Sequence, residues 1–264
     1  MASAEQRIAG IKPGLRVCVT AGAGGIGRAI ADGFIAHGAR VVVSDVAEGA
    51  LADFSRAHPD HHAVAADAGS EAATRALFGT VEERLGGLDL LVNNAGIAGP
   101  TAPVEEIATE AWQATVDINL NGHFYALRAA VPLLKQTENG SIIMISSVAG
   151  RLGYAYRLPY AATKWAIVGM AKSLSLELGS FGIRVNAILP GIVEGPRMDG
   201  VIRDRAATTG VSFEEMRETY LSKTALHRMV TARDIADMAL FLASPMGRNV
   251  SGQALSVCGD VVSI

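Results

Sequence analysis

The chain has 264 residues, of which 50% are hydrophobic and 19% are charged, and its formal net charge is −3. A chain of this length can bury one large core, and its composition excludes a disordered protein and the basic field of a nucleic-acid binder. Two distant cysteines, Cys18 and Cys258, do not make a disulfide framework. No stretch approaches the ~20 apolar residues of a membrane helix, and residues 1–14 lack the apolar run of a secretory signal. We therefore expect a cytoplasmic protein with no membrane or nucleic-acid partner.

Short runs of apolar, often β-branched residues recur along the chain and are typical of buried strands. The weakest of them begins at His62. The predicted strands are Leu15–Thr20, Val41–Ser44, His62–Ala66, Leu88–Asn93, Ser141–Ser146, Ile183–Leu189 and Ala254–Val257.

Segments with apolar residues at helical spacing alternate with these strands. In the first of them Ile26, Ile30 and Phe34 share one face, and Gly38 follows its end. The predicted helices are Gly25–His37, Ser70–Leu85, Val104–Leu120, Gly122–Thr137, Pro159–Leu178, Asp199–Leu221 and Ala232–Ala243.

This alternation predicts an α/β fold, because continuous apolar strands imply a parallel sheet that is covered on both faces. Right-handed crossovers then give a doubly wound, Rossmann-type domain, with a mostly parallel sheet of about seven strands and helices on both faces. No linker, charge block or internal repeat divides the chain, so we expect a single domain over residues 1–264. Many unrelated enzymes share this fold, so it identifies no function by itself.

A glycine-rich turn of sequence TAGAGGIG, residues 20–27, joins the first strand to the first helix. Glycines there let the backbone approach a pyrophosphate, and the helix N-terminus offers free N–H groups and a partial positive charge. Such a turn alone is a weak signal and is often only structural. Its place between the first strand and the first helix favours a dinucleotide-binding site.

Asp45 ends the second predicted strand, 18 residues after Gly27. A carboxylate at this position accepts hydrogen bonds from both hydroxyls of an adenosine ribose and repels a 2′-phosphate. No lysine or arginine is adjacent to Asp45 in the sequence. The pattern therefore favours NAD over NADP, whereas Asp45 without the glycine turn would as often be a solvated strand end.

A second group of residues lies in the other half of the chain. Tyr160 and Lys164 are four residues apart in a predicted helix and so share a face. Ser147 follows the fifth strand, 13 residues before Tyr160, and Asn119 lies upstream in a helical stretch.

Further motifs fall in register with this group: residues 93–96, Asn-Asn-Ala-Gly, close the fourth strand, and Pro190-Gly191 follows the sixth. In their order and on these elements, the motifs resemble the short-chain dehydrogenase/reductase family, and more narrowly its single-domain group. The resemblance runs from Arg16 to Asp260.

The resemblance implies a role for each of four side chains. Tyr160 would be the general acid/base that exchanges a proton with the substrate oxygen. Lys164 and the oxidised nicotinamide would favour the phenolate, and Lys164 would also hold the nicotinamide ribose. Ser147 would orient the substrate oxygen, and Asn119 would anchor a water that links Lys164 to solvent. Hydride would pass directly between the substrate carbon and the nicotinamide.

The same resemblance implies the cofactor contacts. They are Thr20, Gly22, Ile26 and Gly27 at the pyrophosphate, Asp45 at the adenosine ribose, Asp67 and Ala68 beside the adenine, Asn94, Ala95 and Gly96 beneath the ribose, Val193 at the carboxamide through its backbone, and Tyr160 with Lys164.

Three positions depart from the family pattern. The first glycine of the loop is Ala21, a change that the family accepts, and the usual Asp-Gly-Gly near the C-terminus is Cys-Gly-Asp at residues 258–260. Gly195 stands where a threonine usually touches the carboxamide or a phosphate.

Substrate choice is expected to depend on residues 148–159, on the stretch after Gly96 and on a lid over residues 192–224. Arg197 in the lid and Arg151, soon after the catalytic serine, are candidate substrate ligands, because arginine binds carboxylates in a bidentate manner. A solvated amphipathic helix is the alternative explanation for the charges of the lid.

These arginines favour a polar substrate, such as a sugar, a polyol or a hydroxy acid. The alternative is an apolar ketone, steroid-like or 3-oxoacyl, held by Met198, Val201 and Ile202. Tyr154 and Tyr156 either face the substrate or lie on a surface loop, since loops carry many binding residues.

We therefore expect an NAD-dependent oxidoreductase that interconverts a secondary alcohol or hemiacetal and its carbonyl. The histidines show no metal-binding spacing, so no metal is expected. A non-catalytic dinucleotide-binding sensor is the alternative from another class, but the complete catalytic set argues against it. A glycine-loop methyltransferase would leave the tyrosine–lysine pair without a role. By resemblance, the helices at Ala126–Val131 and after Tyr160 build a homo-oligomer, a homotetramer.

Overall fold

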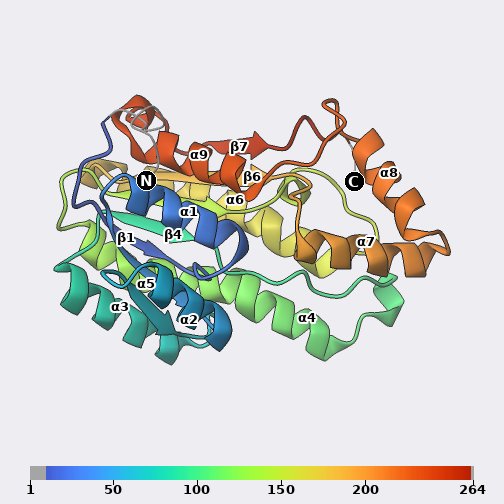
Figure 1. Cartoon of the computed structure of the whole chain (residues 1–264), viewed down its shortest axis with the longest axis horizontal. Coiled ribbons are helices and arrows are strands. Elements are labelled where there is room, and N and C mark those ends of the chain that lie inside the picture. The colour runs from blue at the N-terminus through green and yellow to red at the C-terminus, as the bar shows by residue number, and fades with distance from the viewer. Residues whose placement is uncertain (1–9, 263–264) are drawn as a thin grey trace.

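Seven parallel strands form the central sheet of the structure, in the order β3-β2-β1-β4-β5-β6-β7 (Figure 1). This computed structural model describes residues 10–262, so residues 1–9 of the predicted N-terminal segment lie outside the described part. The predicted doubly wound parallel sheet is confirmed. The strands are β1 (Arg16–Val19), β2 (Arg40–Asp45), β3 (His62–Ala65), β4 (Leu90–Asn93), β5 (Ser141–Ile145), β6 (Arg184–Pro190) and β7 (Ala254–Val257).

Helices cover both faces of this sheet, which is why the strands are continuous apolar runs. On one face Phe34 of α1 and Leu240 of α9 belong to a single buried cluster. On the other face Leu77 of α3, Leu127 of α5 and Ile167 of α6 belong to a second cluster. The α-helices are α1 (Gly25–Ala36), α2 (Glu48–Ala57), α3 (Glu71–Leu85), α4 (Thr109–Val116), α5 (Gly122–Leu134), α6 (Leu158–Leu178), α7 (Pro196–Thr209), α8 (Phe213–Ser222) and α9 (Ala232–Ala243).

The helical segments differ from the prediction in three places. Helix α2 was not predicted, and only one of its residues, Phe54, is buried. The predicted helix over residues 104–120 is a 3₁₀ turn, then α4, then a π-helical turn at Asp117–Asn121. The predicted helix over residues 199–221 is two helices, α7 and α8, because Gly210 ends α7 with φ of +72°.

Helices α7 and α8 lie together at one end of the molecule, away from α2 and α3 (Figure 1). They have a small core of their own, in which Ile202 of α7 and Tyr220 of α8 pack with Val148 and Ile192 from the turns after β5 and β6. The segment from 192 to 224 is thus anchored to the strand ends rather than to the sheet faces.

The described residues contain no helix that could span a membrane. They also contain no group of three or more His, Cys, Asp and Glu side chains that could hold a metal ion. Cys18 lies in β1 and is fully buried, and this burial raises the pKa of its thiol to about 12.

Replacing Leu240 by alanine is expected to lower the free energy of unfolding by about 2–5 kcal/mol, because this buried side chain would leave a cavity between α1 and α9. The matched control is Leu176→Ala on α6, since Leu176 is 82% exposed and the change should stay within about 0.5 kcal/mol. Urea unfolding of both variants measures the difference. Equal losses would contradict the packing described here.

Candidate active site

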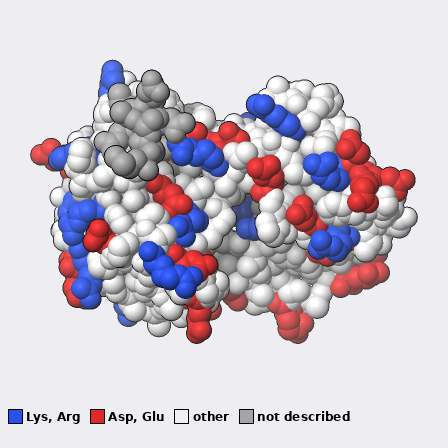
Figure 2. All heavy atoms as spheres, viewed as in Figure 1, with Lys and Arg blue, Asp and Glu red and all other residues white. Residues whose placement is uncertain are grey.

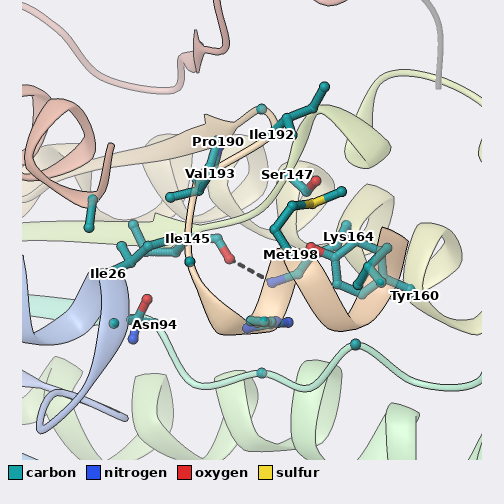
Figure 3. Close-up of a pocket in the computed structure, with 18 of the residues that line it drawn as sticks. Ile26, Asn94, Ile145, Ser147, Tyr160, Lys164, Pro190, Ile192, Val193 and Met198 are labelled. Carbon is teal, nitrogen blue, oxygen red and sulfur yellow. Dashed lines mark hydrogen bonds between the residues drawn. The ribbon is translucent and has the colours of Figure 1, made fainter. Parts of the chain in front are cut away.

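A cavity of about 340 Å³ opens where the chain leaves the carboxyl ends of β1, β4, β5 and β6. Strand order reverses between β1 and β4, and ligands of doubly wound sheets bind at such a switch point. Residues of α6 and α7 complete the lining (Figure 3). Figure 2 shows both signs of charge interspersed on this face of the molecule, which carries no extended basic surface.

The glycine-rich turn after β1 forms one wall of this cavity. A Cβ on Gly27 would lie 2.2 Å from the Ala21 carbonyl oxygen, and one on Gly22 would lie 2.7 Å from that of Val19, so the turn tolerates only glycine there. Gly24 and Gly25 face open space and line the cavity. Because no side chain caps the N-terminus of α1, its N–H groups stay available for a pyrophosphate. The turn therefore fits a dinucleotide.

Asp45, at the end of β2, lines the same end of the cavity. Its Oδ1 accepts hydrogen bonds from the N–H groups of Val46 and Ala47 at 2.9 and 3.1 Å, and its Oδ2 accepts one from Ala23 at 3.3 Å. The carboxylate is thus held in place beside the glycine turn, where the sequence predicts contact with a ribose. No ion pair joins it to a lysine or arginine of the described residues.

Hydrogen bonds tie the glycine turn to the end of β4. The buried Thr20 hydroxyl accepts from the N–H groups of Asn94 and Ala95 at 2.9 and 3.1 Å. The Asn94 amide donates back to the carbonyl oxygens of Thr20 and Ala21. Asn94 and Gly96 line the cavity, while Thr20 and Ala95 support it from behind.

Tyr160 and Lys164 line the cavity from the first turns of α6, and Ser147 faces them from the end of β5 (Figure 3). Pro159 favours the start of this helix, since proline has no N–H to lose at a helix N-terminus. The Lys164 ammonium donates to the Ile145 carbonyl oxygen at 2.9 Å and lies 5.7 Å from the centre of the Tyr160 ring. The structure therefore brings the predicted serine, tyrosine and lysine together.

Lys164 is only 3% exposed. Burial and, to a smaller extent, the positive charge of Arg197 lower the pKa of its ammonium to about 7. An anion beside Lys164, such as a phenolate, would stabilise the charged form.

Asn119 lies in the π-helical turn between α4 and α5, behind the cavity wall. Its Oδ1 accepts from the Ile97 N–H at 2.7 Å, and its Nδ2 donates to the Ile97 carbonyl oxygen and to Thr163. A Cβ on Gly96 would lie 3.2 Å from the Asn119 Oδ1 and 3.4 Å from the Lys164 Nζ. Asn119 and Lys164 therefore flank the same glycine, although Asn119 does not itself line the cavity.

His123 is a part of this support that the sequence analysis did not identify. It is fully buried on α5, and its Nε2 lies 3.1 Å from the Ala95 carbonyl oxygen, which makes Nε2 the protonated nitrogen. Its Nδ1 has no hydrogen-bond partner among the described residues. Burial and the nearby charge of Lys164 lower the pKa of His123 to about 3.

The opposite wall comes from the segment after β6. Val193, Arg197, Met198 and Val201 line it, and Met198 lies on the side of Ser147 and Tyr160 (Figure 3). Gly195 has φ of +131°, a conformation that a threonine would adopt only under strain, so the backbone of this chain suits a glycine at this position.

Other predicted residues lie away from the cavity. Arg151 donates to the Ala254 carbonyl oxygen at 2.7 Å and to Ser256, so its side chain is bound to β7. Asp67 accepts from the Gly69 N–H, and the Ala68 carbonyl oxygen lies 2.7 Å from where a Cβ on Gly122 would stand. These two residues follow β3 and do not line the cavity as it stands.

Two further residues line the cavity and were left undecided or unnoticed in the sequence. Tyr154 is one, and its hydroxyl lies 2.7 Å from that of Tyr220 on α8. Burial raises the pKa of Tyr154 well above its usual range. Arg157, the residue before α6, is the other, and no motif singled it out. Tyr156 by contrast is 40% exposed.

Comparison with known proteins identifies the class. Residues 21–259 match a family model described as enoyl-(acyl carrier protein) reductase. The chain is 35% identical to trans-4-hydroxycyclohexanecarboxylate dehydrogenase of Sinomonas cyclohexanicum, over 91% of this chain and 90% of that protein. It is 34% identical to a sorbitol dehydrogenase of Cereibacter sphaeroides, over 93% of this chain and 96% of that protein.

A solved structure gives the same result. The crystal structure of an actinorhodin polyketide ketoreductase variant with NADPH superposes with a TM-score of 0.88 at 33% identity, and it covers 92% of this chain and 95% of that one. The chain therefore belongs to the short-chain dehydrogenase/reductase family, as its motifs indicated. It is an oxidoreductase of the kind that acts on hydroxyl and carbonyl groups with a nicotinamide dinucleotide.

Tyr160→Phe is expected to lower kcat by about 10²–10⁴-fold, because the ring remains and only the proton-exchanging hydroxyl is lost. Affinity for the dinucleotide, measured by fluorescence titration, should change little. Tyr156→Phe removes the same group from an exposed ring and is the control. Retention of most of the activity in Tyr160→Phe would contradict the assignment.

Acid is expected to destabilise the protein through His123. Its pKa is about 3 in the fold and about 6.5 in the unfolded chain, so between these values only the unfolded chain binds the proton. The stabilisation is present above pH 6.5 and is lost as the pH falls toward 3. Between pH 7.5 and pH 5 the wild type should lose about 2 kcal/mol more unfolding free energy than His123→Gln. Equal losses in urea unfolding would show that His123 does not carry this effect.

Proposed function

We propose that the protein is an NAD-dependent dehydrogenase that interconverts a polar secondary alcohol or hemiacetal and its carbonyl compound. The observation that carries this proposal is the cavity that brings Ser147, Tyr160 and Lys164 together opposite the glycine turn and Asp45. Bound at this turn, the dinucleotide would supply or accept the hydride. The chain would supply position and proton transfer.

Asp45 supports NAD as the cofactor. Three backbone N–H groups hold its carboxylate beside the glycine turn, where it would accept from the ribose hydroxyls and repel a 2′-phosphate. The turn itself, residues 20–27, contains no lysine or arginine that would bind such a phosphate.

The proton steps follow from the side chains at the end of β5. The Ser147 hydroxyl would hold the substrate oxygen toward Tyr160, whose phenol would give or take the proton at that oxygen. Lys164, next to the Tyr160 ring, would stabilise the phenolate and take part in returning a proton to it. Asn119 would hold the backbone of Ile97 in place near Lys164. Both hydrogens of its side-chain amide are already donated, one to Ile97 and one to Thr163.

Charge in the cavity supports a polar substrate. Arg157, Lys164 and Arg197 all line it, against the carboxylates of Asp45 and Glu194. Two of the relatives are named for a hydroxy acid and a polyol.

An apolar carbonyl compound is the second candidate. Val148, Ile192, Met198 and Val201 line the side of the cavity opposite the glycine turn. The structural neighbour is named as a polyketide ketoreductase and was solved with NADPH. A reductase of an apolar or 3-oxoacyl substrate would use the same proton donor.

We also propose a lid, an oligomeric state and a cellular location. Residues 192–224 would act as the lid over the substrate, with α7 and α8 moving together on their shared core. Phe124 on α5 and Trp165 on α6 are 47% and 51% exposed, which supports burial of these helices in a homotetramer. We propose a cytoplasmic location, because the two cysteines are free thiols.

Titration with NAD and NADP, followed by turnover with a panel of polyols, aldoses, hydroxy acids and apolar alcohols, tests the proposal. NAD is expected to bind about 100-fold more tightly than NADP, and Asp45→Ala should remove most of that difference through loss of the ribose contact and of the repulsion. Asp53→Asn changes an exposed carboxylate of α2 and is the control.

Other outcomes would redirect the proposal. Tighter binding of NADP would overturn the role of Asp45. Turnover confined to apolar ketones would favour the second candidate, and binding of NAD without turnover of any compound would favour a dinucleotide-binding sensor.

A further inference from the structure

Arg157 lines the cavity with a guanidinium of which two nitrogens have no hydrogen-bond partner among the described residues. Its side chain is 2% exposed, and it lines the cavity together with Tyr154 and Tyr160. Nη2 donates to the Ala98 carbonyl oxygen at 2.7 Å. Nε and Nη1 are buried and have no hydrogen-bond partner among the described residues.

No carboxylate balances this charge within the described part of the chain, where Arg157 forms no ion pair. The guanidinium lies between two aromatic rings, 5.3 Å from the centre of Tyr154 and 5.1 Å from that of Tyr160. Cation–π contacts offset part of the cost of burying the charge. They leave the free N–H donors unsatisfied, which is costly for a buried charged group.

The position of Arg157 in the chain does not explain the charge. It is the residue before α6, at a helix N-terminus, where the helix dipole disfavours a cation and favours an anion. A role in joining α6 to the loop after β4 uses only the single bond from Nη2 to Ala98. The remaining N–H donors, on Nε and Nη1, therefore favour a role in binding a ligand.

The surroundings indicate the sign of that ligand. Lys164 and Arg197 line the same cavity, and neither forms an ion pair with a described residue. Of the two acidic side chains in the lining, Asp45 is held at the glycine turn by backbone N–H groups, and Glu194 is exposed in the segment after β6 and forms no ion pair with a described residue. The unpaired cations Arg157 and Arg197 in the lining therefore favour an anionic ligand.

We propose that Arg157 binds a carboxylate of the substrate, so that the enzyme acts on a hydroxy acid and the corresponding oxo acid. This rests on the proposed function, since it names the substrate class of the same site. The guanidinium offers a planar set of donors, and Nη1 with the second hydrogen of Nη2 matches the two oxygens of a carboxylate.

Stacking on Tyr160 also sets the distance between the two ends of the substrate. The carbinol oxygen lies at the Tyr160 hydroxyl, and the carboxylate lies at a guanidinium that covers the ring of the same residue. The carboxylate and the reacting carbon are therefore separated by only a few bonds or by one small ring.

The direct test measures binding without turnover. The complex of the enzyme with NADH is titrated with acetate, butyrate and cyclohexanecarboxylate, and each is compared with its carboxamide, which has nearly the same shape and no charge. At least one acid is expected to bind about 10–100-fold more tightly than its amide. Equal affinity within all three pairs would overturn the proposal.

The residue is tested with Arg157→Met, which keeps a long side chain and removes every donor. The preference for the acid should fall to within about threefold, while affinity for the amide and for NADH changes little. Arg157→Gln is the second variant, because its amide can still donate to Ala98 if the methionine variant does not fold. A preference retained in the folded variant would assign the carboxylate to another residue and overturn the role of Arg157.

Arg151→Gln is the matched control, since Arg151 is bound to β7 outside the cavity and its loss should leave the acid preference unchanged. Kinetics with 3-hydroxybutyrate, 4-hydroxycyclohexanecarboxylate and cyclohexanol separate the two proposals. NAD-dependent oxidation of cyclohexanol but not of the acids would leave the proposed function standing and overturn the carboxylate site. Absence of any NAD-dependent turnover, with tight binding of acids that depends on Arg157, would leave the carboxylate site standing and overturn the proposed function.

Discussion

The site depends on one charged group above all, the buried ammonium of Lys164. The Lys164 ammonium lies at the carboxyl end of β5 and is bonded to the Ile145 carbonyl oxygen, almost out of contact with solvent. Its low pKa shows that the fold itself disfavours this charge. A phenolate beside this ammonium would favour its charged form again.

The elements around Lys164 serve to hold this arrangement. Gly96 has no side chain, which lets the β4 loop pass between Asn119 and Lys164. The π-helical turn allows Asn119 to bond both backbone groups of Ile97, and such turns are frequent at functional sites. His123 fixes the Ala95 carbonyl from below and remains neutral because it is buried beside the lysine. The contact with Ala95 and the lowered pKa of the histidine thus both go with the burial of His123.

Charge is distributed unevenly in the cavity, and its substrate end differs from the glycine turn. At the substrate end Arg157 and Arg197 form no ion pair with a described residue, while the acidic Asp45 lies at the glycine turn. The Asp45 carboxylate and these unpaired cations therefore belong to different parts of the cavity lining. On the face of the molecule in Figure 2, by contrast, charges of both signs are interspersed.

The sequence by itself determined the sheet, the glycine turn and the spacing of the four residues that the family resemblance assigns to the reaction, because these depend on local pattern. The apolar run of a buried strand such as β5 is visible in the sequence before the fold is known. Residues four apart, such as Tyr160 and Lys164, share a face in any helix. Helix α2 and the break at Gly210 were missed, since the first buries one side chain and the second depends on a single backbone conformation.

Only the tertiary structure decided which charged residues line the cavity. The sequence analysis named Arg151 as a candidate and did not notice Arg157, yet Arg151 bonds to β7, whereas Arg157 lines the cavity close to the rings of Tyr154 and Tyr160. Their burial depends on strands and helices that are distant in the chain. A side chain's partners are set by this three-dimensional packing, whereas periodicity reports only which face of its own element it occupies.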